Sequence, residues 1–94
     1  MLLYYDPIFL EHATGNHPEC ADRIIPSVRH LNSVALAGGI IRPSCRVASE
    51  ERLARVHSPT YIDSVRQFVA SGGGAIEPDT VVSLRSYDVA RYAA

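Results

Sequence analysis

A chain of 94 residues that offers only two short candidate strands has to find the rest of its sheet elsewhere. Residues 1–5 (MLLYY) are continuously apolar and aromatic, which suits a strand buried on both faces of a parallel sheet. Residues 39–43 (GIIRP) read as a short connecting or strand segment. Because two short strands do not make a stable sheet alone, the sequence predicts the opening of an α/β domain, with residues 1–94 as one partial domain.

The clearest helical pattern begins after a polar loop. Asp22 can cap the start of this helix, and the pair Gly38 and Gly39 can end it. Pro26 is placed in the first turn, where its missing N–H costs little. The apolar positions at helical spacing are Ile24, Val28, Leu31 and Ala35. A helix is therefore expected from Asp22 to the glycine pair.

The second half of the chain is expected to be mostly helical, because hydroxyl caps precede apolar residues at three and four residue spacing. The expected elements are a brief helix from Ser49 to Val56, a helix capped by Ser58 that runs to Ser71, a glycine stop at 72–74, a turn at 77–80 and a last helix from Ser86. This pattern indicates a segment with one or two short strands among helices.

Composition and charge exclude several classes of function. The hydrophobic fraction is 47% and the charged fraction 20%, which is ordinary for a globular chain and argues against disorder. All 9 basic residues are arginines, but they are scattered and the net charge is −1, so no nucleic-acid surface is expected. The two cysteines, Cys20 and Cys45, form no CxxC motif, and neither a secretion signal nor a membrane-spanning run is recognisable. A soluble cytoplasmic protein is expected.

The loop at residues 5–23 holds the densest set of chemically active side chains. Its two histidines, His12 and His17, are five positions apart, and no third ligand is placed by helical spacing, so no metal site is expected in this chain alone. The glycines at 72–74 follow a helix and lack a P-loop lysine, so a helix stop is favoured over a phosphate cradle.

Three blocks of sequence occur in the order seen in a known family. They are residues 15–19 (GNHPE) with Arg23, residues 55–62 (RVHSPTYI), and the stretch from the glycines at 72–74 through residues 78–80 (PDT) to Ser86. Together they resemble the start of the histone deacetylase superfamily, most like its class II and bacterial members. Those members include deacetylase-like amidohydrolases and acetylpolyamine amidohydrolases.

The resemblance implies a fold and a chemistry. The fold would be the N-terminal portion of a parallel-sheet α/β domain of the arginase/deacetylase type. The family uses zinc, held by two aspartates and a histidine, to hydrolyse the amide of acetyl-lysine or an acetylpolyamine. This chain contains neither an Asp-x-His motif nor a His-His pair. We therefore expect the segment to lack the zinc ligands and any catalytic residue, and to be inactive alone.

The resemblance assigns four residues to peripheral roles. Arg23 matches the arginine that lines an internal channel, where its guanidinium would hold acetate. Asp79 falls where the family has an acidic residue that grips the substrate backbone, and His17 and Glu19 match the entrance loop. From the residues alone, Arg23 reads as an ordinary surface arginine, and only the resemblance lifts the channel role to an equal footing. Asp79 is equally well explained as a turn residue.

A different class of function stays open. Missing sheet neighbours would leave a strand edge and apolar helix faces uncovered, which is typical of a module that folds with a copy of itself or with a partner. The sequence therefore also permits a non-catalytic interaction module or remnant, which would fold as a homo-oligomer or with a partner. The choice among histone, other protein and polyamine substrates is not readable.

Overall fold

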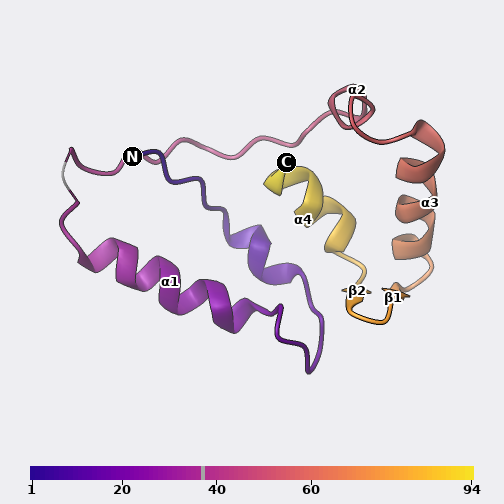
Figure 1. The fold of residues 1–94 in the computed structure, drawn as a ribbon, viewed down its shortest axis with the longest axis horizontal. Helices are drawn as coiled ribbons and strands as arrows, with labels where there is room; N and C mark the ends of the chain where they lie inside the picture. Colours follow the sequence, from indigo (N-terminus) through magenta and orange to yellow (C-terminus); the bar gives the residue numbers. More distant parts are fainter. Residues whose placement is uncertain (37) are drawn as a thin grey trace.

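The computed structural model describes residues 1–36 and 38–94. Along the chain the elements are η1 (Pro7–Glu11), α1 (Ala21–Ser33), α2 (Glu50–Leu53), α3 (Pro59–Ala70), β1 (Gly74–Glu77), β2 (Thr80–Val82) and α4 (Ser86–Ala93). Figure 1 shows the chain running from its N-terminus through η1, turning back through α1 and past its own N-terminus, and then passing around the other side through α2 and α3 to α4. Helices make up most of the regular structure, as expected, but β1 and β2 are not the candidate strands at residues 1–5 and 39–43.

The apolar run at residues 1–5 pairs with the second candidate strand in parallel. An isolated bridge joins Leu2 to Ile41, and the Leu3 N–H donates to the Ile41 carbonyl at 2.9 Å. The prediction of a strand buried on both faces is wrong, however, since Leu2 is 59% and Ile41 63% exposed. The described residues place no further strand beside this pair, so its side chains face solvent and the pairing stays at one bridge.

Helix α1 forms, but its predicted ends are wrong. It begins after Cys20, with Asp22 in its first turn instead of at the cap. It ends at Ser33, well before the glycine pair, because Val34 turns to extended backbone and the Ser33 hydroxyl bonds to the His30 carbonyl at 2.8 Å. Ala37, inside the span expected to be helical, lies outside the described residues.

Pro26 and residues 7–11 are two further departures. Pro26 lies inside α1, beyond the first turn in which we expected it. Residues 7–11, expected to be loop, form the 3-10 helix η1, whose first free amide, at Ile8, donates to the Asp6 carboxylate at 2.9 Å.

Two of the three hydroxyl caps expected in the second half are confirmed, whereas Ser86 does not cap α4. Ser49 accepts the Arg52 N–H at 3.3 Å, and Ser58 accepts the Tyr61 N–H at 3.2 Å. Both bonds satisfy amides that a helix start leaves free. Helix α2 is shorter than expected and gives way to turns before Val56.

The glycine run stops α3 as predicted, but it opens a hairpin that the sequence analysis missed. Strands β1 and β2 pair antiparallel with Gly74 opposite Val82 and Glu77 opposite Thr80. The register shifts between Ala75 and Glu77. The expected turn forms the two-residue tip between the strands. Strands of four and three residues are too short to show an alternating pattern, which is why the pairing was not foreseen.

The buried apolar side chains are few and lie mainly where α3 meets α4. They are Ala48, Ile62, Val69 and Val89. The molecule is a flat slab of 43 × 33 × 17 Å with a radius of gyration of 15.2 Å, whereas about 12 Å is usual for this length. Its accessible surface is 6738 Å², against about 5,400 Å² for a compact protein of this mass. Roughly 1,300 Å² of surface is therefore left uncovered.

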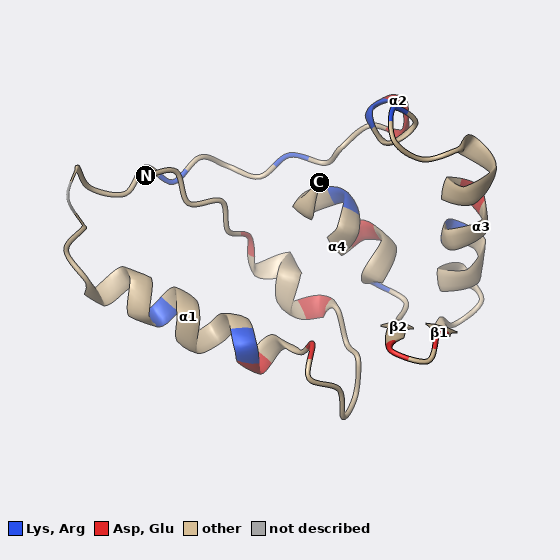
Figure 2. Ribbon diagram, viewed as in Figure 1, with Lys and Arg blue, Asp and Glu red and all other residues tan. Residues whose placement is uncertain are grey.

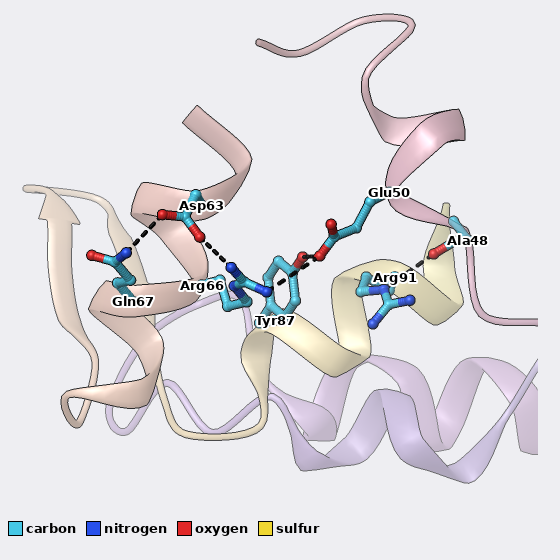
Figure 3. Close-up of polar contacts among 7 residues, drawn as sticks. All are labelled: Ala48, Glu50, Asp63, Arg66, Gln67, Tyr87 and Arg91. Atoms are coloured by element: carbon cyan, nitrogen blue, oxygen red, sulfur yellow. Dashed lines mark hydrogen bonds and ion pairs between the residues drawn. The ribbon is translucent and has the colours of Figure 1, made fainter. Parts of the chain in front are cut away.

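Polar contacts add to the packing of α2, α3 and α4 (Figure 3). Arg66 of α3 pairs with Asp63 and lies 3.5 Å from the Glu50 carboxylate of α2. The hydrogen bond and charge of Asp63 raise the pKa of Arg66 above its ordinary value. On the other side, Arg91 of α4 donates to the Ala48 carbonyl at 3.1 Å. The ion pairs are exposed, so water screens them and burial of the apolar residues dominates.

Replacing Val69 by alanine is expected to lower the free energy of unfolding by about 2 kcal/mol, because Val69 is only 3% exposed and its loss leaves a cavity. The matched control is Val56→Ala, since Val56 is 79% exposed and should change stability by less than about 0.5 kcal/mol. Urea unfolding followed by far-UV circular dichroism measures both. Equal losses of unfolding free energy in the two variants would show that Val69 does not belong to the core.

Candidate functional site

Residues 12–19 lie against the tip of the β1–β2 hairpin, and the two segments line an open pocket of about 250 Å³. Its lining residues are His12, Thr14, His17, Glu19, Asp79, Thr80, Val81 and Val82. Two segments about sixty positions apart in sequence therefore form its walls. The pocket gathers both histidines of the loop with two of the carboxylates that the sequence analysis singled out.

His17 joins the two walls directly. Its Nδ1 accepts the Glu19 N–H at 3.0 Å, and its Nε2 lies 3.1 Å from the Asp79 carbonyl oxygen, 62 positions away in sequence. Because Nδ1 accepts a hydrogen bond, the proton of the neutral ring is on Nε2, which donates it to Asp79. One imidazole thus bridges the loop at residues 12–19 and the hairpin tip, using both nitrogens.

The loop side of this bridge is held by its own hydrogen bonds. The buried Thr14 hydroxyl donates to the Glu19 carbonyl, and the His17 N–H donates to the Gly15 carbonyl at 3.0 Å. Gly15 has a φ of 66°, a conformation that glycine adopts without strain. The loop is therefore folded on itself around His17.

A second set of hydrogen bonds ties the same loop to the start of α4. Ser86, only 5% exposed, accepts the Ser83 N–H at 2.7 Å, and its hydroxyl oxygen lies 2.7 Å from His12 Nδ1. The Ser83 hydroxyl in turn accepts the Ala13 N–H at 3.1 Å. The sequence analysis foresaw Ser86 only as a helix cap, but the cap position belongs to Arg85 and Ser86 instead bonds back to residue 83.

Comparison with known proteins gives this arrangement a family. No protein-family model matches the chain. The uncharacterized protein slr0245 of Synechocystis sp. is 35% identical over 97% of this chain, and a probable deacetylase of Methanothermobacter thermautotrophicus is 28% identical over all of it. The polyamine deacetylase HDAC10 of Homo sapiens is 33% identical over 70% of the chain. These relatives support the histone deacetylase superfamily as the family of this segment.

The fold agrees with that family. The crystal structure of the HDA15 HD domain superimposes on 98% of this chain with a TM-score of 0.83, at 22% sequence identity. A likeness at that identity shows the fold alone, and it confirms the partial arginase/deacetylase-type fold that the sequence predicted. The chain spans 31%, 28% and 10% of the lengths of its three sequence relatives and 28% of the HDA15 chain.

The four residues that the deacetylase resemblance singled out fall into two pairs. His17 contacts the backbone of Asp79, whose side chain is exposed at the hairpin tip. Glu19 forms an ion pair with Arg23 one helical turn away. Arg23 does not line the pocket, and its side chain is 61% exposed, as expected of an ordinary surface arginine in this segment taken alone.

The residues present do not suit the zinc ion that the superfamily implies. Across residues 1–36 and 38–94, no three histidine, cysteine or acidic side chains gather closely enough to hold a metal ion. Both nitrogens of His17 and the Nδ1 of His12 already have hydrogen-bond partners. The pocket is therefore built from hydrogen bonds and not as a metal centre.

Charge and hydropathy give no second candidate site. Figure 2 shows acidic and basic positions spread over the helices and loops, with no long run of basic positions in the part of the chain described. Among the same residues, no helix has the length and apolar character needed to cross a bilayer. The hairpin tip and entrance loop thus remain the candidate site.

Proposed function

We propose that this chain is the N-terminal part of a zinc-dependent deacetylase-like amidohydrolase, which removes acetyl groups from acetyl-lysine or an acetylpolyamine. The observation that carries the proposal is the bridge from His17 to Asp79, since it joins the predicted entrance loop to the predicted substrate-gripping residue across 62 positions. The segment would form one wall of the active-site entrance. The zinc ligands and the hydrolytic step would come from outside residues 1–94.

Asp79 would grip the substrate backbone from the pocket rim. Its carboxylate can accept N–H groups of a substrate, and charge-assisted bonds of that kind are stronger than neutral ones. Its exposed place at the tip of a two-residue turn leaves the carboxylate accessible. For Asp79 to bind the substrate in this way, the described residues need only hold the hairpin in place.

Arg23 would hold the acetate product in a channel behind the entrance. A planar guanidinium suits a carboxylate because two of its N–H groups can donate in parallel. Its partner in the structure, the Glu19 side chain, carries the same functional group as acetate. If Glu19 released the guanidinium, or shared it with acetate, Arg23 would bind the product through the same kind of carboxylate contact.

Replacing Asp79 by asparagine is expected to raise KM for a peptide substrate roughly tenfold while kcat changes little, because the grip acts on binding and not on the reacting bond. The assay compares acetyl-lysine peptide with acetylated polyamine, using the full-length polypeptide that contains these residues. Glu77→Gln is the matched control, since it neutralises an exposed carboxylate at the end of β1. An equal KM change in the control, or no metal-dependent turnover of either substrate by the wild type, would contradict the proposal.

A non-catalytic interaction module is the second candidate, favoured by the uncovered surface. The roughly 1,300 Å² of excess surface exceeds the ~800 Å² that each partner buries in a standard protein interface. Sedimentation equilibrium of the purified chain separates the readings. A discrete dimer without deacetylase activity in the full-length product would support the module, and a compact monomer would contradict it.

A further inference from the structure

We propose that His17 is a positioning residue, which clamps the hairpin tip to the entrance loop and so fixes the Asp79 carboxylate for the substrate. This inference rests on the proposed function for its last step. The clamp itself rests on the two hydrogen bonds of the imidazole, one to Glu19 and one to Asp79.

To form both hydrogen bonds of the clamp, the side chain at residue 17 needs one acceptor and one donor on a rigid planar ring. Nδ1 has to accept the Glu19 N–H while Nε2 donates to the Asp79 carbonyl, so only the neutral ring protonated on Nε2 fulfils both roles. The ring is half-buried between the two walls of the pocket. Its position is therefore set from both sides.

The hairpin needs this support because little else holds its tip. The first turn position is Pro78, whose ring fixes a negative φ. No non-glycine residue in the described part of the chain has a positive φ. The mirror-image turns that suit two-residue hairpins need a positive φ, so the tip does not adopt them. Every residue of β1 is exposed, and the register shifts at Ile76. A two-stranded hairpin with these features is marginally stable by itself.

The loop, in contrast, is a firm anchor. The buried Thr14 hydroxyl donates to the Glu19 carbonyl, and the His17 N–H donates to the Gly15 carbonyl at 3.0 Å. His17 thus connects the weakly supported hairpin tip to a loop that is held by its own hydrogen bonds. Since the bond is to the backbone carbonyl of Asp79, it restricts the Cα position from which the carboxylate extends.

Two substitutions divide the clamp into its halves. Asparagine carries its oxygen at the position of Nδ1, so His17→Asn keeps an acceptor for the Glu19 N–H but does not reach Asp79. Glutamine carries its amide nitrogen at the position of Nε2, so His17→Gln keeps the donor to Asp79 and loses the fixed acceptor.

The experiment measures amide hydrogen exchange of both variants and the wild type in the full-length polypeptide, in peptides covering residues 15–20 and 76–83. His17→Asn is expected to speed exchange at the hairpin roughly fivefold and to leave the loop protected, whereas His17→Gln should do the reverse. The same preparations give kcat and KM. KM should rise roughly fivefold in His17→Asn, with kcat within about twofold, and should rise less in His17→Gln, which keeps the donor to Asp79.

The outcomes separate the clamp from the function. Unchanged hairpin exchange in His17→Asn, or equal effects of the two variants, would overturn the clamp. Faster hairpin exchange without a KM change in an active enzyme would overturn the positioning role. If the wild type hydrolyses no acetylated substrate, the proposed function fails, and the exchange pattern alone then decides whether His17 is the clamp.

Discussion

Replacing Gly73 by alanine is expected to lower the free energy of unfolding by about 3 kcal/mol and to detach the hairpin from α3. Gly73 has a φ of 76°, which costs an L-residue about 1–2 kcal/mol. A Cβ at this position would also lie 2.3 Å from the Val82 carbonyl oxygen of β2, so the backbone of the strand would have to move. Urea unfolding followed by circular dichroism measures the loss.

Gly38→Ala is the matched control for Gly73. Gly38 has a φ of 79°, nearly the same backbone conformation, but a Cβ there meets nothing within 4 Å. It should cost about 1–2 kcal/mol, the price of the dihedral alone. The difference between the two variants isolates the close approach to β2. Equal losses would show that the hairpin is not packed against the end of α3 as described.

The features that the sequence predicted correctly depend on contacts between near neighbours. Ser49 and Ser58 cap helices by bonding to amides three residues later, so the residue types alone specify the geometry. The glycine stop after α3 is equally local, because it needs only residues that tolerate a positive φ. These signals do not depend on what the rest of the molecule does.

The sequence prediction failed for two different reasons. Leu2 and Ile41 pair in parallel, but burial of a strand depends on distant neighbours that residue patterns in this segment do not supply. The early end of α1, in contrast, is decided by local contacts. Glycine at residues 38–39 permits a helix to end, but the Ser33 hydroxyl and the extended backbone of Val34 end it sooner.

The candidate site was predicted by resemblance and not by physics. His17, Glu19, Arg23 and Asp79 were named from matching blocks, and nothing in their spacing indicated that His17 would bond to the residue 79 carbonyl. Roles for these residues stay predictions until they are assayed. His12 drew attention as a possible metal ligand, yet the structure uses its Nδ1 in a hydrogen bond to a serine that lies 74 positions away.

That serine, Ser86, is expected to matter more for stability than its small side chain suggests. Ser86→Ala should lower the free energy of unfolding by about 2 kcal/mol, because the half-buried Ser83 N–H and the His12 ring each lose a partner at 2.7 Å. Alanine is a good helix former, so the loss cannot come from α4 itself. Thermal unfolding at fixed pH, with circular dichroism as the probe, gives the difference.

Ser64→Ala supplies the control, since the Ser64 hydroxyl is exposed and bonds only to the Tyr61 carbonyl within α3. It should change stability by less than about 0.5 kcal/mol. A double-mutant cycle with His12→Ala then tests the partner, because two residues that share a hydrogen bond are expected to couple by about 1 kcal/mol. Additive losses would mean that Ser86 supports the turn at residue 83 alone. Coupled losses would mean that the loop carrying His12 and His17 folds together with α4, so that the same contacts hold both this loop and the hairpin tip in place.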